Sequence, residues 1–297
     1  MKMRHRHEAR FLRRGAIACV SVLLIGTSAC AAESSLGGPQ DSFPEVSIEG
    51  MEEVHALLDF ETANAVTPMS KYLINSDFEL QALYSHSAAT IIDNCMTEQG
   101  EQYAYLSETP WAQLRPLEDR LFGPWDLDSA ATFGFQIDIR RGIPTPSSVA
   151  RGSHVFSQCA EVVMDDPALS EVAALLQAQT IADRIRAKSY FMTKESEEGK
   201  AAHQVFRDCL TDKSIALDSE SGYPSASYME MGGEAEIEAA VAGVQCNLGT
   251  GRLQTLFDLQ ARYETAYMKV YEAQLSEVLT QKQQLREMLQ QIIDGST

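Results

Sequence analysis

The longest periodic stretch of the chain runs from Thr250 to Ile293 and reads TGRLQTLFDLQARYETAYMKVYEAQLSEVLTQKQQLREMLQQII. Within it, apolar residues recur with heptad spacing, which Lys282 interrupts. They are Tyr271, Leu275, Val278, Leu285, Leu289 and Ile292. This spacing places them on one face of a helix. We therefore expect one long C-terminal helix over residues 250–297, about 40 residues and roughly 60 Å in length. Its glutamine-rich end either protrudes from the body or pairs with a second helix, such as that of a second copy.

The preceding part of the chain, residues 47–249, is predicted to be a mainly α-helical body. Ser76 to Glu79 reads as a capping box, which marks the start of a helix. An apolar stripe follows at spacings of three and four, through Leu80, Tyr84, Ala88, Ile91 and Cys95. Gly100 stands where that helix is expected to stop.

Further helices are expected over 153–164, from Asp166 to about Phe191, over 201–210 and over 234–246. A short helix is expected over 51–60, and residues 211–233 are expected to form a loop. Residues 133–139 alternate apolar and polar side chains, which favours an extended segment packed on the helices.

The first thirty residues are typical of an export signal that ends at a cysteine. Six basic residues precede an apolar run, residues 16–25, that is too short to span a membrane. Small residues then lead to Cys30, a pattern typical of bacterial lipoproteins. We expect residues 1–29 to be the signal peptide and Cys30 to carry the lipid, such as palmitate. Since Thr27 stands where lipoproteins usually have Leu, cleavage near Ala29 or Ala31 to release a secreted protein is the alternative.

Residues 30–46 are rich in Ser, Gly and Pro, and we interpret them as a flexible tether. The leader holds six of the 24 Lys and Arg residues and one of the 42 Asp and Glu residues, so 18 basic and 41 acidic residues remain, a charge of −23. Such a body repels phosphate backbones and anionic lipid, so no nucleic-acid partner is expected. We therefore expect the protein to attach to the membrane through the lipid on Cys30. This predicts that the protein is located on the extracytoplasmic face of the cell membrane.

The remaining cysteines are Cys95, Cys159, Cys209 and Cys246, an even number in an oxidising compartment. Two disulfides are therefore expected, and four cysteines allow three connectivities. We favour Cys95–Cys159 and Cys209–Cys246, because these pairs join neighbouring helices without crossed loops.

Tyr263, Tyr267 and Tyr271 form a stripe with a spacing of four residues. Such a stripe can stack on a sugar or anchor a protein partner, and these three are the candidate binding residues. We favour the other interpretation, in which the three tyrosines lie on the side of the helix that faces the core.

No motif of a hydrolase, a phosphate-binding loop or a zinc protease is present, so no catalytic residue, metal or cofactor is predicted. Tyr190 and Lys194 have the spacing seen in short-chain dehydrogenases, but no glycine-rich turn precedes them, which favours an ordinary helix end. His154 and His203 precede cysteines, which raises the question of a Cys/His metal site. Disulfide formation removes the thiols that such a site needs, so no metal is expected there.

Three segments resemble a group of uncharacterised actinobacterial lipoproteins. They are Cys95-Met96-Thr97-Glu98-Gln99-Gly100, Arg120-Leu121-Phe122-Gly123, and Cys246 with the long helix after it. The resemblance covers roughly residues 77–290 and implies a cell-surface lipoprotein of mainly helical fold. It implies no activity.

The leading hypothesis is a lipid-anchored, non-catalytic protein that contacts the cell envelope or another protein. One alternative is an envelope enzyme with an unrecognised carboxylate site, which a strongly raised carboxyl pKa in a pocket would favour. The other is a small-ligand-binding lipoprotein, which a large pocket would favour.

Overall fold

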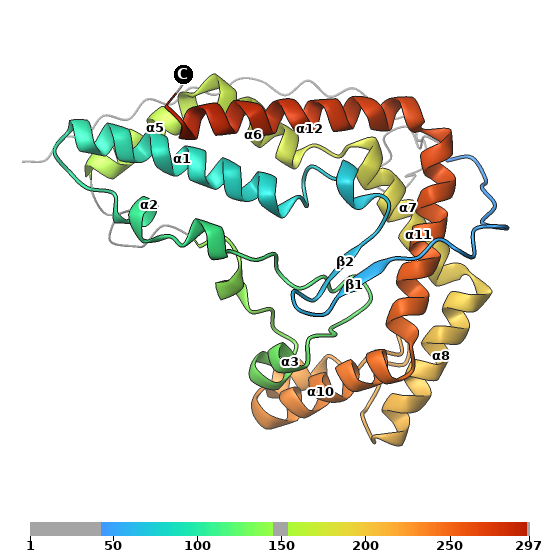
Figure 1. The fold of residues 1–297 in the computed structure, drawn as a ribbon. Helices are drawn as coiled ribbons and strands as arrows, with labels where there is room; N and C mark the ends of the chain where they lie inside the picture. Colours follow the sequence, from blue (N-terminus) through green and yellow to red (C-terminus); the bar gives the residue numbers. More distant parts are fainter. Residues whose placement is uncertain (1–42, 145–153, 296–297) are drawn as a thin grey trace, which may run out of the picture. The chain divides into compact units, whose positions relative to one another are not determined.

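The C-terminal stretch forms two helices rather than one (Figure 1). In the computed structural model, which describes residues 43–144 and 154–295, α11 spans Arg252–Val270 and α12 spans Glu272–Ile293. Tyr271 between them has φ −110° and ψ 24°, and the helix axis changes direction there. The expected continuous helix of about 40 residues is therefore wrong; the long C-terminal helix is α12.

The two helices differ in their main packing partners. Most of α11 is buried, and it lies against α7 (Ile181–Glu195) and α8 (Glu197–Asp212). By contrast, α12 buries the stripe predicted from the heptad, and it lies on α1 (Phe78–Glu98). Tertiary packing thus divides a stretch that contains no proline.

The α1 helix starts one residue later than the expected capping box. Asp77, not Ser76, is the N-cap, and its carboxylate accepts a hydrogen bond from the Leu80 N–H at 2.8 Å. Gly100, at φ +79°, follows the end of the helix as expected. The buried face of α1 also packs against α5 (His154–Asp165) and α6 (Pro167–Gln177).

The helix expected from Asp166 to Phe191 is two helices, α6 and α7. Asp166 caps α6 with Pro167 in its first turn, as expected. A capping box, made by Thr180 and Asp183, then starts α7. That box overrides the continuous apolar pattern across residues 178–180.

A third group of elements lies around α10 (Gly233–Gly249), which packs on α3 (Leu127–Phe133), α8 and α9 (Ser227–Met231). The expected loop over 211–233 therefore contains a short helix. The extended segment expected over 133–139 is also wrong, because Phe133 is the last residue of α3 and Gly134, at φ +59°, ends that helix.

Residues 51–60 do not form the expected helix. Strand β1 (Leu57–Asp59) pairs antiparallel with β2 (Asn64–Val66), and the Asp59 carboxylate accepts hydrogen bonds from the N–H groups of Glu61 and Thr62 in the turn. The short elements η1 (Ser70–Tyr72), α2 (Ala104–Glu108), η2 (Trp111–Gln113) and η3 (Ile139–Arg141) complete the described chain.

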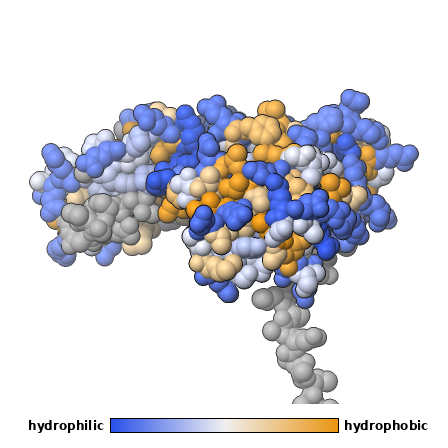
Figure 2. All heavy atoms as spheres, turned by 90° about the horizontal axis from the view of Figure 1, so that it is seen from below, coloured by the Kyte–Doolittle hydropathy of each residue, from blue (hydrophilic) through white to orange (hydrophobic). Residues whose placement is uncertain are grey.

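The described elements belong to one compact unit, which begins at Glu45. On the face seen in Figure 2, apolar residues gather in the middle and hydrophilic residues lie to both sides. None of the described helices is long and apolar enough to cross a membrane. The predicted signal peptide, Cys30 and most of the predicted tether lie outside the described residues.

Candidate functional site

A pocket of about 350 Å³ lies between the end of α7, the outer face of α8, the start of α11 and the loop that follows α8. Five basic side chains converge there in this acidic chain, counting His203. The residues that define it are Lys194, Lys200, His203, Arg207, Tyr223 and Arg252. We refer to it below as the basic pocket.

Local geometry brings these side chains together. His203 and Arg207 are four residues apart on α8, so they share one face of that helix. Two glycines allow the close approaches around them. A Cβ on Gly199 would lie 2.0 Å from the Thr193 carbonyl oxygen, and one on Gly222, at φ +68°, would lie 2.5 Å from Arg207 Cδ. Glycine at both positions therefore lets α7 and the loop close on the pocket.

Arg252 forms the floor of the basic pocket and is only 2% exposed. Its Nη1 donates to the Phe122 carbonyl at 2.7 Å and also to the Asn247 side-chain oxygen, and its Nη2 donates to the Tyr223 hydroxyl at 2.7 Å. The guanidinium also lies 4.5 Å from the centroid of the Phe206 ring. These neutral partners hold the side chain in place without neutralising its charge.

No carboxylate among the described residues forms an ion pair with Arg252 or Arg207, and the Nε of each is buried without a hydrogen-bond partner. A buried charge without a counter-ion is costly, and a bound anion relieves that cost. Guanidinium groups are also suited to bidentate binding of phosphate and carboxylate. The arrangement therefore favours an anion.

His203 reports the positive potential of the pocket. Burial lowers the pKa of its imidazole, and the nearby charges of Arg252, Arg207 and Lys194 lower it further. A hydrogen bond of 2.9 Å from Nε2 to the Ser221 carbonyl acts in the opposite direction. The depressed pKa favours the neutral ring, which leaves the guanidinium and ammonium groups as the charged donors.

The acidic groups near the pocket lie at its rim. Glu220 is exposed, and Glu195 lies 3.4 Å from Lys200 on the surface. Lys194, in addition, lies 5.2 Å from the centroid of the Tyr190 ring, which is the helix-end arrangement that the sequence favoured over a dehydrogenase pair. Solvent screens such rim charges strongly, so they do not replace a counter-ion for the buried Arg252.

The four cysteines lie in two pairs at disulfide distance, with the expected connectivity. Cys95–Cys159 joins α1 to α5, and Cys209–Cys246 joins α8 to α10. The second disulfide lies beside the pocket in sequence, because Cys246 directly precedes Asn247, a partner of Arg252. It therefore fixes the helix that carries Arg207 against the helix that supports Arg252.

Two of the three residues of the tyrosine stripe are buried. Tyr263 and Tyr267 are 8% and 1% exposed and belong to the core, as the favoured interpretation has it, whereas Tyr271 is half-buried at the junction of α11 and α12. Cys30, the predicted lipidation site, lies outside the described residues.

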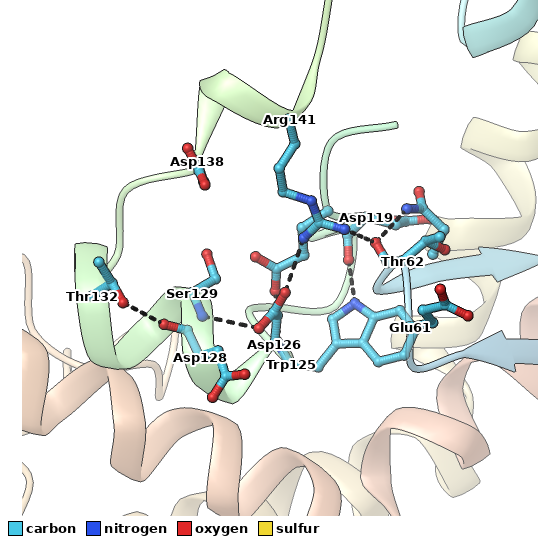
Figure 3. A network of polar contacts seen from close by, with 12 residues as sticks. Glu61, Thr62, Asp119, Trp125, Asp126, Asp128, Ser129, Thr132, Asp138 and Arg141 are labelled. Carbon is cyan, nitrogen blue, oxygen red and sulfur yellow. Dashed lines mark hydrogen bonds and ion pairs between the residues drawn. The ribbon is translucent and has the colours of Figure 1, made fainter. Parts of the chain in front are cut away.

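Carboxylates gather at a second place, between α3 and the turn after β1 (Figure 3). Arg141 donates to the Asp126 carboxylate at 2.9 Å and to the Thr62 carbonyl at 2.7 Å, which ties that turn to α3. Asp138 pairs with Arg140, whose hydrogen bond lowers the pKa of the carboxyl. With Asp126 and Asp138 engaged by arginines, we interpret this network as a structural clamp.

No group of three or more His, Cys, Asp or Glu side chains within residues 43–144 and 154–295 is arranged to hold a metal ion. No known family, curated protein or solved structure matches the chain. The choice of the basic pocket as the candidate site therefore depends on its geometry alone.

Sequence reasoning considered Lys194 and His203 separately, for other chemistries, and missed Arg207 and Arg252. Each of these arginines stands in an ordinary helical context. A signal was nevertheless present: basic residues of a strongly acidic chain that fall on the apolar side of predicted helices are candidates for a buried charge.

Proposed function

We propose that the protein is an exported, lipid-anchored binding protein that holds a small anionic ligand in the basic pocket. The observation that carries this proposal is Arg252, a cation 2% exposed that has neutral hydrogen-bond partners and lines a pocket of about 350 Å³. This volume lies within the range of small-molecule sites. The acidity of the surrounding chain disfavours a nucleic acid or another large polyanion as the ligand.

The proposal is tested by isothermal titration of inorganic phosphate into the full-length protein in detergent. We expect one site per chain, with an affinity that falls as salt is added. Arg207→Gln is expected to weaken binding at least tenfold, because a hydrogen bond to a charged group is worth about 1.5–3 kcal/mol. The matched control is Arg140→Gln, which removes the same charge from an exposed pair outside the pocket. No heat with the wild type, or equal losses in both variants, would overturn the proposal.

The cellular location rests on the leader. The basic front, the short apolar run and the small residues before Cys30 support cleavage and lipidation at that cysteine. Intact-mass analysis of the protein extracted from its own membrane tests this: we expect a chain that starts at a diacylated Cys30. An unlipidated chain that starts elsewhere would contradict it. The resemblance to actinobacterial lipoproteins agrees with this location and stays a prediction.

A second candidate function, contact with an envelope protein, is favoured by exposed apolar side chains. Leu57, Phe60 and Ile139 are 67%, 66% and 75% exposed. A photoreactive residue at position 60 should then form a specific adduct in intact cells, whereas one at the exposed position 230 should not. Equal labelling at both positions would remove this candidate.

A further inference from the structure

A second, apolar pocket of about 150 Å³ adjoins the basic pocket. Its lining is mostly aromatic and aliphatic and includes Pro124, Phe135, Phe206, Pro224 and Met229. Tyr223 lines both pockets, so the two are neighbours at that residue. We refer to this second cavity as the apolar pocket.

Phe206 also links the linings of the two pockets through its contacts. Phe206 lines the apolar pocket and carries the Arg252 guanidinium on its ring at 4.5 Å. The rings of Phe206 and Tyr223 lie 5.9 Å apart. A ligand whose charged group lies against Arg252 is thus separated from the apolar pocket only by the rings of Phe206 and Tyr223.

The size of the apolar pocket limits what enters it. A cavity of about 150 Å³ lined by apolar side chains holds one benzene molecule. Gly243 on α10 borders this pocket and is buried, yet an added Cβ there would have no heavy atom within 4 Å. Open space beside a buried glycine identifies a void that is not filled by the protein itself.

We propose that the ligand is an organic phosphate or a similar dianion that carries one small apolar group, a single ring or a short hydrocarbon chain. This inference rests on the proposed anion-binding function. The anionic group lies against Arg252 and Arg207, and the apolar group passes along Tyr223 into the apolar pocket. The two pockets together select against inorganic anions and against long acyl chains.

The test compares two probes, inorganic phosphate and 3-phenylpropyl phosphate, by isothermal titration into the full-length protein. We expect the phenylpropyl ester to bind at least tenfold more tightly. Gly243→Leu should remove this gain, since its side chain fills the apolar pocket, and should leave the affinity for inorganic phosphate unchanged. Gly249→Leu is the matched control, because Gly249 lies on the same helix, also has open space around it, and is exposed.

The outcomes separate the two proposals. Absence of phosphate binding would overturn the proposed function itself. Phosphate binding without a gain from the phenylpropyl group would overturn only the inference. A gain that persists in Gly243→Leu would also overturn it, since the apolar group would then lie elsewhere.

Discussion

The guanidinium of Arg252 lies on the ring of Phe206, 4.5 Å from its centroid. This contact joins the first residue of α11 to the middle of α8, and it places a buried cation where the described residues supply no carboxylate partner. Packing against an aromatic face stabilises a desolvated cation only in part. A bound anion, as proposed above, would offset the cost in stability of this buried charge.

The two disulfides should differ in their effect on binding. Their loops span 64 and 37 residues, so on the chain-entropy model each stabilises the fold by about 4 kcal/mol. Replacing Cys209 and Cys246 by serine should lower phosphate affinity as well as stability, because α8 and α10 carry or support the arginines. The double serine variant at Cys95 and Cys159 is the matched control and should lower stability alone. Equal losses of affinity in both, by titration below the unfolding temperature, would contradict this role.

A buried glutamate makes stability depend on pH. Glu264 is 0% exposed, and burial raises the pKa of its carboxyl, although hydrogen bonds from Thr67, Gln260 and the Met69 N–H oppose the shift. The folded state thus binds this proton more tightly than the unfolded state. Its contribution to the free energy of unfolding should fall as pH rises from about 4.3, the ordinary glutamate pKa, through the raised value.

Glu264→Gln removes that titration. The free energy of unfolding of the variant, relative to wild type, should increase between pH 5 and pH 8 in urea titrations. Glu230→Gln, at an exposed position, is the control and should leave the difference unchanged. A Glu264→Gln difference that stays constant over this range would exclude a raised pKa at Glu264.

A buried ion pair joins the N-cap of α1 to α12. Lys282 is 6% exposed, and its ammonium lies 2.5 Å from the Asp77 carboxylate. Asp77→Asn keeps the side-chain cap of α1 but leaves Lys282 uncompensated, which should cost about 3–5 kcal/mol. Adding Lys282→Met should recover the part of that loss that arises at Lys282, whereas the pair between Asp77 and Arg286 stays broken.

A double-mutant cycle by urea unfolding measures this coupling. The exposed pair of Asp138 and Arg140 serves as the control, and Asp138→Asn should cost less than about 1 kcal/mol. Simple additivity of the Asp77 and Lys282 substitutions would show that the pair does not hold α12 in place.

Much of the helical fold could be predicted because local signals agree with the tertiary structure. The stripe on α12 matches its heptad, and the helices that carry the cysteines lie close to where periodicity placed them. The break at Tyr271 could not be predicted in the same way. We attribute it to packing, because α11 lies mainly on α7 and α8 whereas α12 lies mainly on α1, and not to a helix-breaking residue.

The strands were missed for a different reason. A three-residue strand such as β1 has no measurable period, and its pairing with β2 depends on the turn that Asp59 organises. The basic pocket was missed because its charges come from α7, α8 and α11, which only the fold brings together. The interruption of the heptad by Lys282 was recognised, and the structure explains it as a pairing with Asp77.

Anion binding in the basic pocket is tested most directly at His203 itself. Sulfate, whose charge stays constant over the range, is added to the full-length protein while the NMR signals of the His203 ring are followed from pH 5 to pH 8; His203→Gln assigns them. An anion among Lys194, Arg207 and Arg252 offsets charges that lower this pKa. If the basic pocket binds the anion, we expect saturable shifts, a rise in the His203 pKa and tighter sulfate binding at lower pH. Ring signals and a pKa that sulfate leaves unchanged would contradict it.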